Sequence, residues 1–164
     1  MSLETTLCYV EREDEYLMLH RISKADDVNQ GKWIGVGGKF EEGESPEECM
    51  MREVREETGL TVTQWSYRGI VTFVSPHSAT EYMHLFTIQG WTGDMRECDE
   101  GELAWVPRER LFDLPHWEGD EIFLSLIRDQ DVPFFSLKLV YDAADTLVDA
   151  RLNGERVDIQ AGGR

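Results

Sequence analysis

The chain alternates apolar runs with short polar segments, and most of these runs have the length and pattern of β-strands. Residues 7–10 and 16–20 are apolar on either side of the polar segment 11–15, which predicts two strands joined by a turn. Stretches rich in β-branched and aromatic residues follow at 61–74, 82–89 and 103–106. The runs 134–141 and 146–151 predict a terminal hairpin.

Two other stretches have the periodicity of helices. Ser45 can cap the first, with Pro46 at its first position and Glu48 completing a capping box, and Gly59 ends it as a left-handed residue. A second helix is expected over residues 119–128, where apolar residues share one face. The remaining segments predict a short glycine-rich strand, two loops and a helical turn, at 33–40, 23–32, 75–80 and 107–111.

Strands mixed with two main helices indicate the α/β class. A length of 164 residues suits a single domain with a real core, because hydrophobic residues make up 41% of the chain. We expect this domain to span residues 1–152. Residues 153–164 are expected to form a flexible tail.

The composition limits the partners of the chain. Lys and Arg number 16 against 33 Asp and Glu, which gives a formal charge of −17. This field repels DNA, RNA and anionic membranes, so neither a polynucleotide nor a membrane partner is expected. No apolar run approaches the roughly 20 residues that span a bilayer, and the first residues have no signal-peptide pattern. The three cysteines are widely spaced, which indicates reduced thiols and a cytoplasmic protein.

Three glutamates of the first predicted helix, Glu53, Glu56 and Glu57, recur at positions i, i+3 and i+4. Side chains at this spacing share one helical face. Like charges so placed destabilise a helix by roughly a few tenths of a kcal/mol per pair unless a cation lies between them. The spacing by itself is compatible with a solvated acidic surface as well as with a metal site. The opposite arc is apolar and is expected to pack on a sheet; it contains Met50, Met51, Val54 and Thr58.

The residues around these glutamates extend the pattern. Gly38 is followed by five residues and Glu44, then by seven residues and the run Arg-Glu-Val-x-Glu-Glu-x-Gly-Leu, which ends at Leu60. This segment resembles the signature of the Nudix hydrolases at every fixed position. Segments 32–39 and 117–120 are similar to the MutT-type branch, which cleaves oxidised purine nucleoside triphosphates. The likeness covers most of residues 5–150 and implies an α/β/α sandwich around a mixed β-sheet.

The resemblance implies a divalent-metal site for Mg²⁺, with Mn²⁺ also possible, because carboxylate oxygens suit such hard cations. Glu56 and Glu57 are the first-choice ligands by family likeness. Glu53 is expected to be a further ligand or the base that deprotonates the attacking water, and Glu44 is a second candidate for that base. The backbone carbonyl of Gly37 is expected to add a ligand, since two adjacent glycines allow close approach of the chain.

Two further residues are expected at the metal site. Glu100 lies in an acidic loop from which, in this branch, a glutamate reaches back to the metal; Glu102 is the alternative, and a solvated loop is the competing interpretation. Arg52 is expected to orient one of the glutamates through an ion pair, with direct substrate contact as the alternative.

The expected substrate contacts divide between phosphate and base. Gly38 and Lys39, at the double glycine, and Arg21 are the candidates for phosphate. Trp33, Phe73 and Trp117 are candidates for stacking on a purine, although each is also a plausible core residue and Phe73 is better explained as core. Asp120 can accept hydrogen bonds from a guanine-type edge. The histidines have no metal-ligand spacing and are interpreted as structural or surface residues: His20, His77, His84 and His116.

Two positions depart from the pattern of the mammalian members of this branch. Ile34 stands where they have an Asn, and Gly119 stands where they have a second Asp. These departures leave the identity of the base open.

The resemblance implies Mg²⁺-dependent hydrolysis of a nucleoside triphosphate to the monophosphate and pyrophosphate. An oxidised purine nucleotide such as 8-oxo-dGTP is the expected substrate, which would make the protein a nucleotide-pool sanitiser. The alternatives are the same chemistry on ADP-ribose, a dinucleoside polyphosphate or a canonical dNTP, a Nudix-fold module that binds a nucleotide without cleaving it, and an isomerase on this fold.

Overall fold

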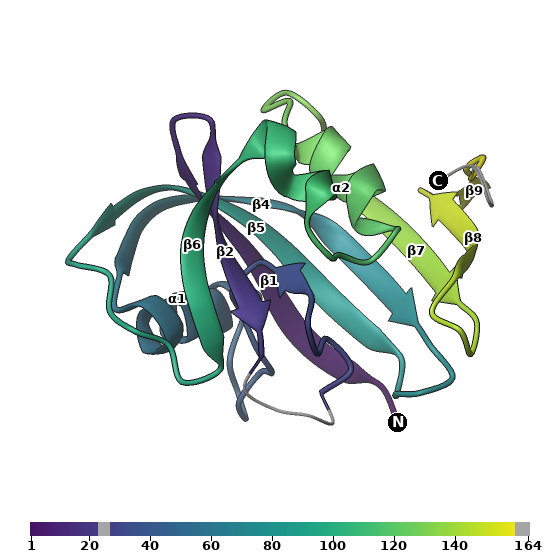
Figure 1. Cartoon of the computed structure of the whole chain (residues 1–164), viewed down its shortest axis with the longest axis horizontal. Coiled ribbons are helices and arrows are strands. Elements are labelled where there is room, and N and C mark those ends of the chain that lie inside the picture. The colour runs from purple at the N-terminus through teal and green to yellow at the C-terminus, as the bar shows by residue number, and fades with distance from the viewer. Residues whose placement is uncertain (23–26, 160–164) are drawn as a thin grey trace.

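The computed structural model describes residues 1–22 and 27–159 of the chain (Figure 1). In this part of the chain the elements follow the order β1 (Leu3–Arg12), β2 (Glu15–Arg21), β3 (Trp33–Ile34), α1 (Pro46–Thr58), β4 (Thr61–Val74), β5 (Glu81–Thr92), β6 (Gly101–Pro107), the 3₁₀-helix η1 (Arg108–Asp113), α2 (Asp120–Ile127), β7 (Phe135–Tyr141), β8 (Leu147–Leu152) and β9 (Glu155–Arg156). Neither α-helix in the described residues has the length and apolar character needed to cross a bilayer.

The strands form one mixed sheet. Its order is β3-β2-β1-β5-β4-β7-β8-β9, and β6 pairs with β2 outside this path. The β1–β5 and β4–β7 pairs are parallel, whereas the other pairs, including the β1–β2 and β7–β8 hairpins, are antiparallel. The expected mixed sheet is therefore confirmed.

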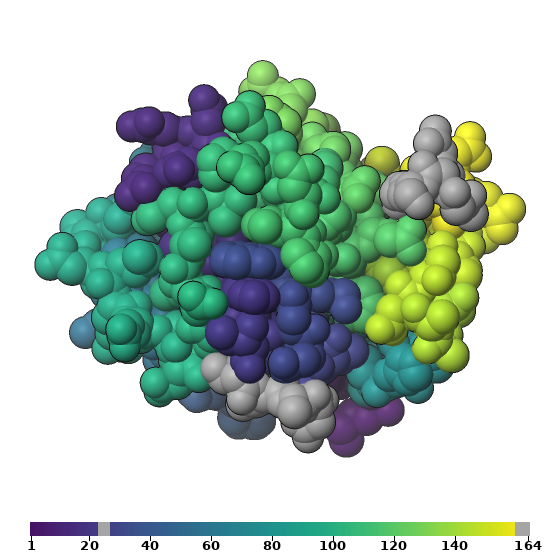
Figure 2. Space-filling view, viewed as in Figure 1, coloured from purple at the N-terminus to yellow at the C-terminus, as the bar shows by residue number. Residues whose placement is uncertain are grey.

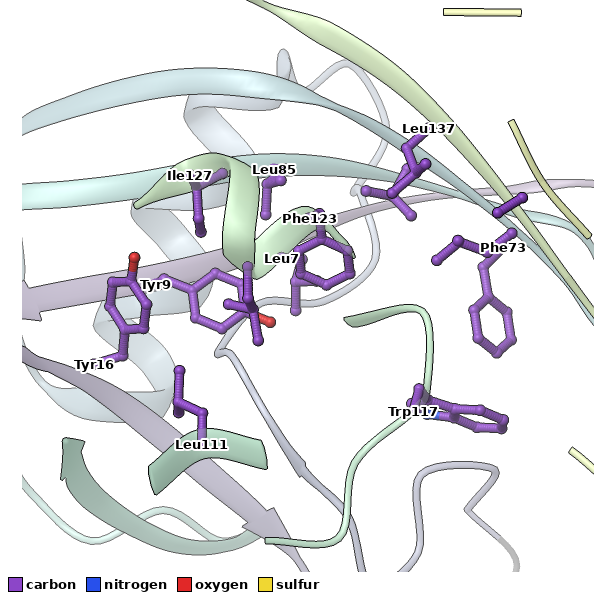
Figure 3. Close-up of a cluster of buried hydrophobic side chains, with 14 of the residues drawn as sticks. Leu7, Tyr9, Tyr16, Phe73, Leu85, Leu111, Trp117, Phe123, Ile127 and Leu137 are labelled. Carbon is purple, nitrogen blue, oxygen red and sulfur yellow. The ribbon is translucent and has the colours of Figure 1, made fainter. Parts of the chain in front are cut away.

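Both faces of the sheet are buried, and each is covered by one helix. Successive residues of β1 point to opposite faces: Leu7 and Tyr9 belong to the core cluster on the α2 side, whereas Cys8 and Val10 belong to the cluster on the α1 side. Figure 1 shows α1 and α2 on opposite sides of the sheet, and Figure 3 shows Tyr9 beside Phe123 of α2. These layers confirm the α/β/α sandwich.

Helix α1 forms as its caps predict. The Ser45 hydroxyl accepts a hydrogen bond from the Glu48 backbone N–H at 3.1 Å, and the Glu48 carboxylate accepts one from the Ser45 backbone N–H at 2.9 Å. Gly59 ends the helix with a φ of 84°. Met50 and Val54 are fully buried on the inner side, so the helix is held firmly against the sheet.

The glycine-rich segment differs from the expected strand over residues 33–40. Only Trp33–Ile34 forms a strand, after which residues 36–40 run antiparallel beside β1 with isolated bridges at Val36 and Lys39. The approach to β1 is close because Gly37 has no side chain: a Cβ there would lie 2.1 Å from the Thr6 carbonyl oxygen. The predicted strand is therefore replaced by isolated bridges beyond Ile34.

Some predicted boundaries also differ. The polar turn over residues 11–15 is shorter than expected, because β1 continues to Arg12 and β2 begins at Glu15. In the expected tail, residues 155–156 form strand β9, and the Val157 N–H donates to the Ala150 carbonyl at 2.8 Å. Residues 160–164 of that tail, and 23–26 of the expected loop over 23–32, lie outside the described residues.

We predict that the inner face of α1 is critical for stability. Met50 is 0% exposed, whereas the adjacent Met51 is only partly buried. Met50→Ala should lower the free energy of unfolding by about 2–5 kcal/mol, because it removes buried methylenes and leaves a cavity. Met51→Ala is the matched control and should cost clearly less. Urea unfolding followed by circular dichroism measures both, and equal losses would contradict the burial described for these two side chains.

Candidate active site

A cleft of about 780 Å³ lies where β1, the segment after β3 and α1 meet. Most residues expected from the sequence to contact metal or substrate line this cleft: Arg21, Gly37, Gly38, Lys39, Arg52, Glu53, Glu56, Glu100, Trp117 and Asp120. Of the α1 glutamates, Glu53 and Glu56 line the cleft, whereas Glu57 does not. The arrangement brings together residues that are up to a hundred positions apart in the chain.

The double glycine lets backbone and carboxylates approach closely. The Gly37 N–H donates to Glu57 Oε1 at 2.8 Å, and this hydrogen bond joins the segment after β3 to α1. A Cβ at Gly38 would lie 2.5 Å from Glu53 Oε2, so any side chain there would push this carboxylate away. Both glycines are therefore required by contacts on either side of the segment.

Arg52 holds several of the glutamates in place. Its Nε donates to Glu44 Oε2 at 2.6 Å, and its Nη1 lies 2.9 Å from Glu53 Oε1 and 3.3 Å from Glu56 Oε2. The second terminal nitrogen donates to the Lys39 carbonyl at 3.0 Å. The expected ion pair between Arg52 and a glutamate of the signature segment is thus present, and Arg52 contacts three of these glutamates.

Glu44 is the anchor of this arginine. Its hydrogen bonds with Arg52 lower the pKa of Glu44 to about 2, and its Oε1 also accepts from the Glu41 N–H at 2.8 Å. Glu44 is not among the residues that line the cleft. A carboxylate so acidic and so fully occupied is poorly suited to take a proton from water.

Glu57 and Glu53 are the buried carboxylates of the site. Glu57 is 5% exposed, and burial followed by a hydrogen bond with Glu100 raises its pKa well above the ordinary value. Its Oε2 atom is buried and has no hydrogen-bond partner. Burial also raises the pKa of Glu53, although Arg52 opposes this shift. Crowded, desolvated carboxyl groups with an unsatisfied oxygen are the chemistry expected of a site that a cation would complete.

The residues present fit a hard divalent cation, although they do not form a ready-made ligand cage. Across residues 1–22 and 27–159, no three His, Cys, Asp or Glu side chains converge as a metal site. The Glu56 side chain is 56% exposed and is turned toward Arg52. Glu100, which arrives from the loop before β6, also lies 3.6 Å from Arg21 Nη2. Glu53, Glu56, Glu57 and Glu100 together supply the oxygen donors that such an ion prefers.

Apolar and aromatic side chains and the buried carboxylate of Asp120 also line the cleft. Asp120, at the start of α2, is 7% exposed, and burial raises its pKa to about 7. Trp117 is 3% exposed, and its ring meets Phe73 edge-on at 4.9 Å (Figure 3). The expected core role of Phe73 is confirmed by its membership of the core cluster. Trp117 belongs to the same core cluster, and both side chains also line the cleft.

Gly119 has a structural reason for being a glycine. A Cβ at this position would lie 2.5 Å from Leu139 Cδ1 and 2.6 Å from the Tyr141 hydroxyl. The Gly119 N–H donates to the same hydroxyl at 2.8 Å. A larger residue here would therefore force the Leu139 and Tyr141 side chains to move.

Trp33 is not brought to the cleft. It stacks on His20 with ring centroids 4.5 Å apart, whereas the next residue, Ile34, lines the cleft. Neighbouring residues of a strand point to opposite sides, and the sequence did not reveal which side faced the cleft. Tyr9 and Asn29 also line it and were not selected from the sequence. The alternation of β1 places Tyr9 on the same face as Leu7 and was the available signal for the tyrosine, whereas a loop residue such as Asn29 has no periodic signal.

Comparisons with known proteins agree with this geometry. Residues 1–127 match the family model described as the NUDIX domain. An uncharacterized Nudix hydrolase, YvcI, from Bacillus subtilis (strain 168) is 32% identical over 127 residues, which cover 74% of this chain and 77% of that protein. An oxidized purine nucleoside triphosphate hydrolase from Danio rerio is 33% identical over 99 residues, 59% of this chain and 63% of that protein.

Solved structures give the same class. The crystal structure of the MutT protein from Bacillus halodurans superposes with a TM-score of 0.80 at 27% identity, covering 93% of this chain and 99% of that one. The chain belongs to the Nudix hydrolase family and has the fold of its MutT-type branch. Enzymes of this family generally use divalent cations and act on small nucleotide substrates, which agrees with the donor oxygens and the size of the cleft.

The buried Asp120 should make stability depend on pH. Its folded-state pKa of about 7 lies above the ordinary 3.8, so the folded state binds more protons than the unfolded state between these values. The stability that this group contributes is therefore present at low pH and is lost as the pH rises toward 7. Asp120→Asn removes the titration. As the pH rises through this window, the free energy of unfolding of the variant should therefore increase by a few kcal/mol relative to that of the wild type.

Urea unfolding from about pH 4.5 to 8 in EDTA measures this difference. Asp131→Asn, at an exposed aspartate, is the matched control and should keep the wild-type dependence. An Asp120→Asn profile parallel to that of the wild type would contradict the burial of this carboxylate.

Proposed function

We propose that the protein is a Mg²⁺-dependent nucleoside triphosphate diphosphatase that hydrolyses an oxidised purine nucleotide such as 8-oxo-dGTP. The products would be the nucleoside monophosphate and pyrophosphate, and the role would be sanitation of the nucleotide pool in the cytoplasm. One observation carries the proposal: a single cleft is lined by carboxylates of α1, by aromatic and apolar side chains, and by the buried Asp120. A nucleoside triphosphate likewise combines charged phosphates with a flat, less polar base.

The polyphosphate end would work by neutralising and positioning charge, as phosphoryl-transfer sites generally do. Glu56, Glu57 and Glu100 would hold the cation, with the Gly37 carbonyl as an added ligand and with Glu53 either as a further ligand or as the base. When bound, Mg²⁺ would supply positive charge to phosphate oxygens and acidify a coordinated water.

The neighbouring cationic groups would assist at this end. Lys39 is exposed and lines the cleft, and Arg21 lines it beside Asp27 and Glu100, so both would contact phosphate oxygens. Arg52 is held by Glu44 and the Lys39 carbonyl, which favours a positioning role for this guanidinium over direct contact with substrate.

Glu53 is the preferred candidate for the base that deprotonates the attacking water. It lines the cleft and has a raised pKa, whereas Glu44 lies behind Arg52 with a pKa of about 2. A base needs a pKa close to the working pH to accept a proton efficiently.

The substrate proposal is supported by similarity as well as by the cleft. Relatives named as oxidized purine nucleoside triphosphate hydrolases, from Danio rerio and Mus musculus, are 33% and 31% identical over 99 residues. Asp120 would accept hydrogen bonds from the N–H groups of a guanine-type base, and the surrounding apolar side chains would cover its faces.

The direct test is a hydrolysis screen over oxidised and normal nucleoside triphosphates, ADP-ribose and dinucleoside polyphosphates. With Mg²⁺ we expect monophosphate and pyrophosphate to form, fastest from 8-oxo-dGTP, and with EDTA we expect no turnover. Chromatography of the products identifies the bond that is cleaved. Faster turnover of ADP-ribose, or unchanged turnover in EDTA, would overturn the proposal.

Variants of Glu56 and Glu57 test the assigned metal ligands. Glu56→Gln and Glu57→Gln should each lower kcat/KM by roughly 100-fold or more, since charge stabilisation at such a site is worth several kcal/mol. Glu42→Gln, at an exposed glutamate before the helix, is the control and should retain wild-type rates. Isothermal titration with Mg²⁺ or Mn²⁺ should show weakened binding in the first two variants. Wild-type rates and affinities in both would reject the proposed metal site.

A further inference from the structure

The loop before β3 is fastened to the segment before α2 by three contacts. Trp117 Nε1 donates to Asn29 Oδ1 at 2.8 Å, the Lys32 ammonium lies 4.2 Å from the centre of the Trp117 ring, and the Trp33 N–H donates to the Pro115 carbonyl at 2.8 Å. In Figure 2 the blue atoms of this stretch lie directly against the green atoms that precede α2. The position of Asn29 in the cleft is therefore set by packing across the molecule.

The orientation of the Asn29 amide follows from its partner. An indole N–H can only donate, so the atom that faces Trp117 must be the amide oxygen. The Asn29 backbone N–H donates to Asp27 Oδ1 at 3.1 Å, and its carbonyl accepts from the Lys32 N–H at 2.9 Å. The side-chain NH₂ is the polar group that remains, and it has no hydrogen-bond partner among the described residues.

This free donor lines the cleft together with both polar and apolar side chains, Asp27 among them. Val28, Ile34, Phe73 and Met83 line the same space, and Asp120 follows Trp117 by three residues, with its N–H donating to the Trp117 carbonyl at 3.0 Å. A donor and a carboxyl group that line the same cleft match a ring that has a carbonyl oxygen beside an N–H group. The 6-oxopurines have this edge, whereas adenine has no carbonyl oxygen.

We propose that Asn29 selects oxopurine nucleotides by donating a hydrogen bond from its side-chain NH₂ to a carbonyl oxygen of the base. This inference rests on the proposed function, since it assigns the base end of the same cleft. Asn29 is then a specificity residue, and Trp117 is the positioning residue that fixes its orientation. A base without a carbonyl oxygen would leave the donor unpaired, which lowers the affinity for that base.

The competing explanation is that Asn29 only supports Trp117. The two roles are separated by Asn29→Asp, which keeps an oxygen to accept from the indole N–H but removes the NH₂ donor. A purely supporting role predicts that this variant binds nucleotides as the wild type does. Asn29→Leu removes both functions and serves as the reference for loss of the support.

The experiment measures binding of nucleoside monophosphates without metal, so that its result does not depend on turnover. Isothermal titration with dGMP, dIMP and 8-oxo-dGMP is compared with dAMP for the wild type, Asn29→Asp and Asn29→Leu. We expect the wild type to prefer the three oxopurines, and Asn29→Asp to weaken their binding about tenfold while changing dAMP little, because one hydrogen bond is lost. Thermal unfolding checks that each variant is folded.

Three outcomes would overturn the inference. The wild type could bind dAMP as tightly as the oxopurines, or Asn29→Asp could retain the wild-type preference. A third result, equal weakening of all four nucleotides in Asn29→Asp, would indicate repulsion of phosphate by the added charge. A different result would separate the two proposals. If the wild type prefers oxopurines, Asn29→Asp loses that preference and no triphosphate is hydrolysed, the proposed function is rejected and the role of Asn29 in base selection is supported.

Discussion

The burial of the Glu57 carboxyl group under the double glycine is the constraint on which the candidate site depends. The Gly37 N–H donates to Glu57 at 2.8 Å, and this contact is possible because Gly37 presses against the backbone of β1 with no room for a side chain. The same segment places Gly38 against Glu53 and brings Lys39 to the cleft. If this segment moved away from α1, Glu57 would lose its hydrogen bond with Gly37, and Lys39 would move away from the carboxylates of the helix.

Charge is organised locally in a chain that is strongly acidic overall. The formal charge is −17, yet the guanidinium of Arg52 is surrounded by Glu44, Glu53 and Glu56, which fixes the carboxylates on α1 before any ion binds. Glu57 is desolvated instead and shares a hydrogen bond with Glu100. Helix α1 therefore carries two carboxylates paired with Arg52, those of Glu53 and Glu56, and one buried carboxyl group, that of Glu57, whose Oε2 atom has no hydrogen-bond partner among the described residues. Glu44, which precedes the helix, makes the shortest contact with Arg52.

The sequence predicted some parts of this arrangement better than others. Helix α1 was predicted accurately because its capping box, its closing glycine and its apolar arc are all local signals. The glycine-rich segment was predicted as a longer strand, whereas beyond Ile34 it makes only isolated antiparallel bridges with β1, because local sequence does not record how regularly a segment pairs with a distant strand. Trp33 was expected to face a base, but it stacks on His20 while Ile34 lines the cleft. Asn29 was not noticed, since its position depends on a contact with Trp117, 88 residues away.

The sequence by itself determined the helix boundaries, the shared face of the three glutamates, the net charge and the resemblance to the Nudix family. Each of these depends on residue identity and on spacing within a short stretch. Only the tertiary structure decided that Glu100 meets Glu57, that Glu44 lies behind Arg52, and that Asp120 is buried enough to raise its pKa to about 7. Desolvation and hydrogen bonding depend on which distant segments pack together, and no local pattern records that packing.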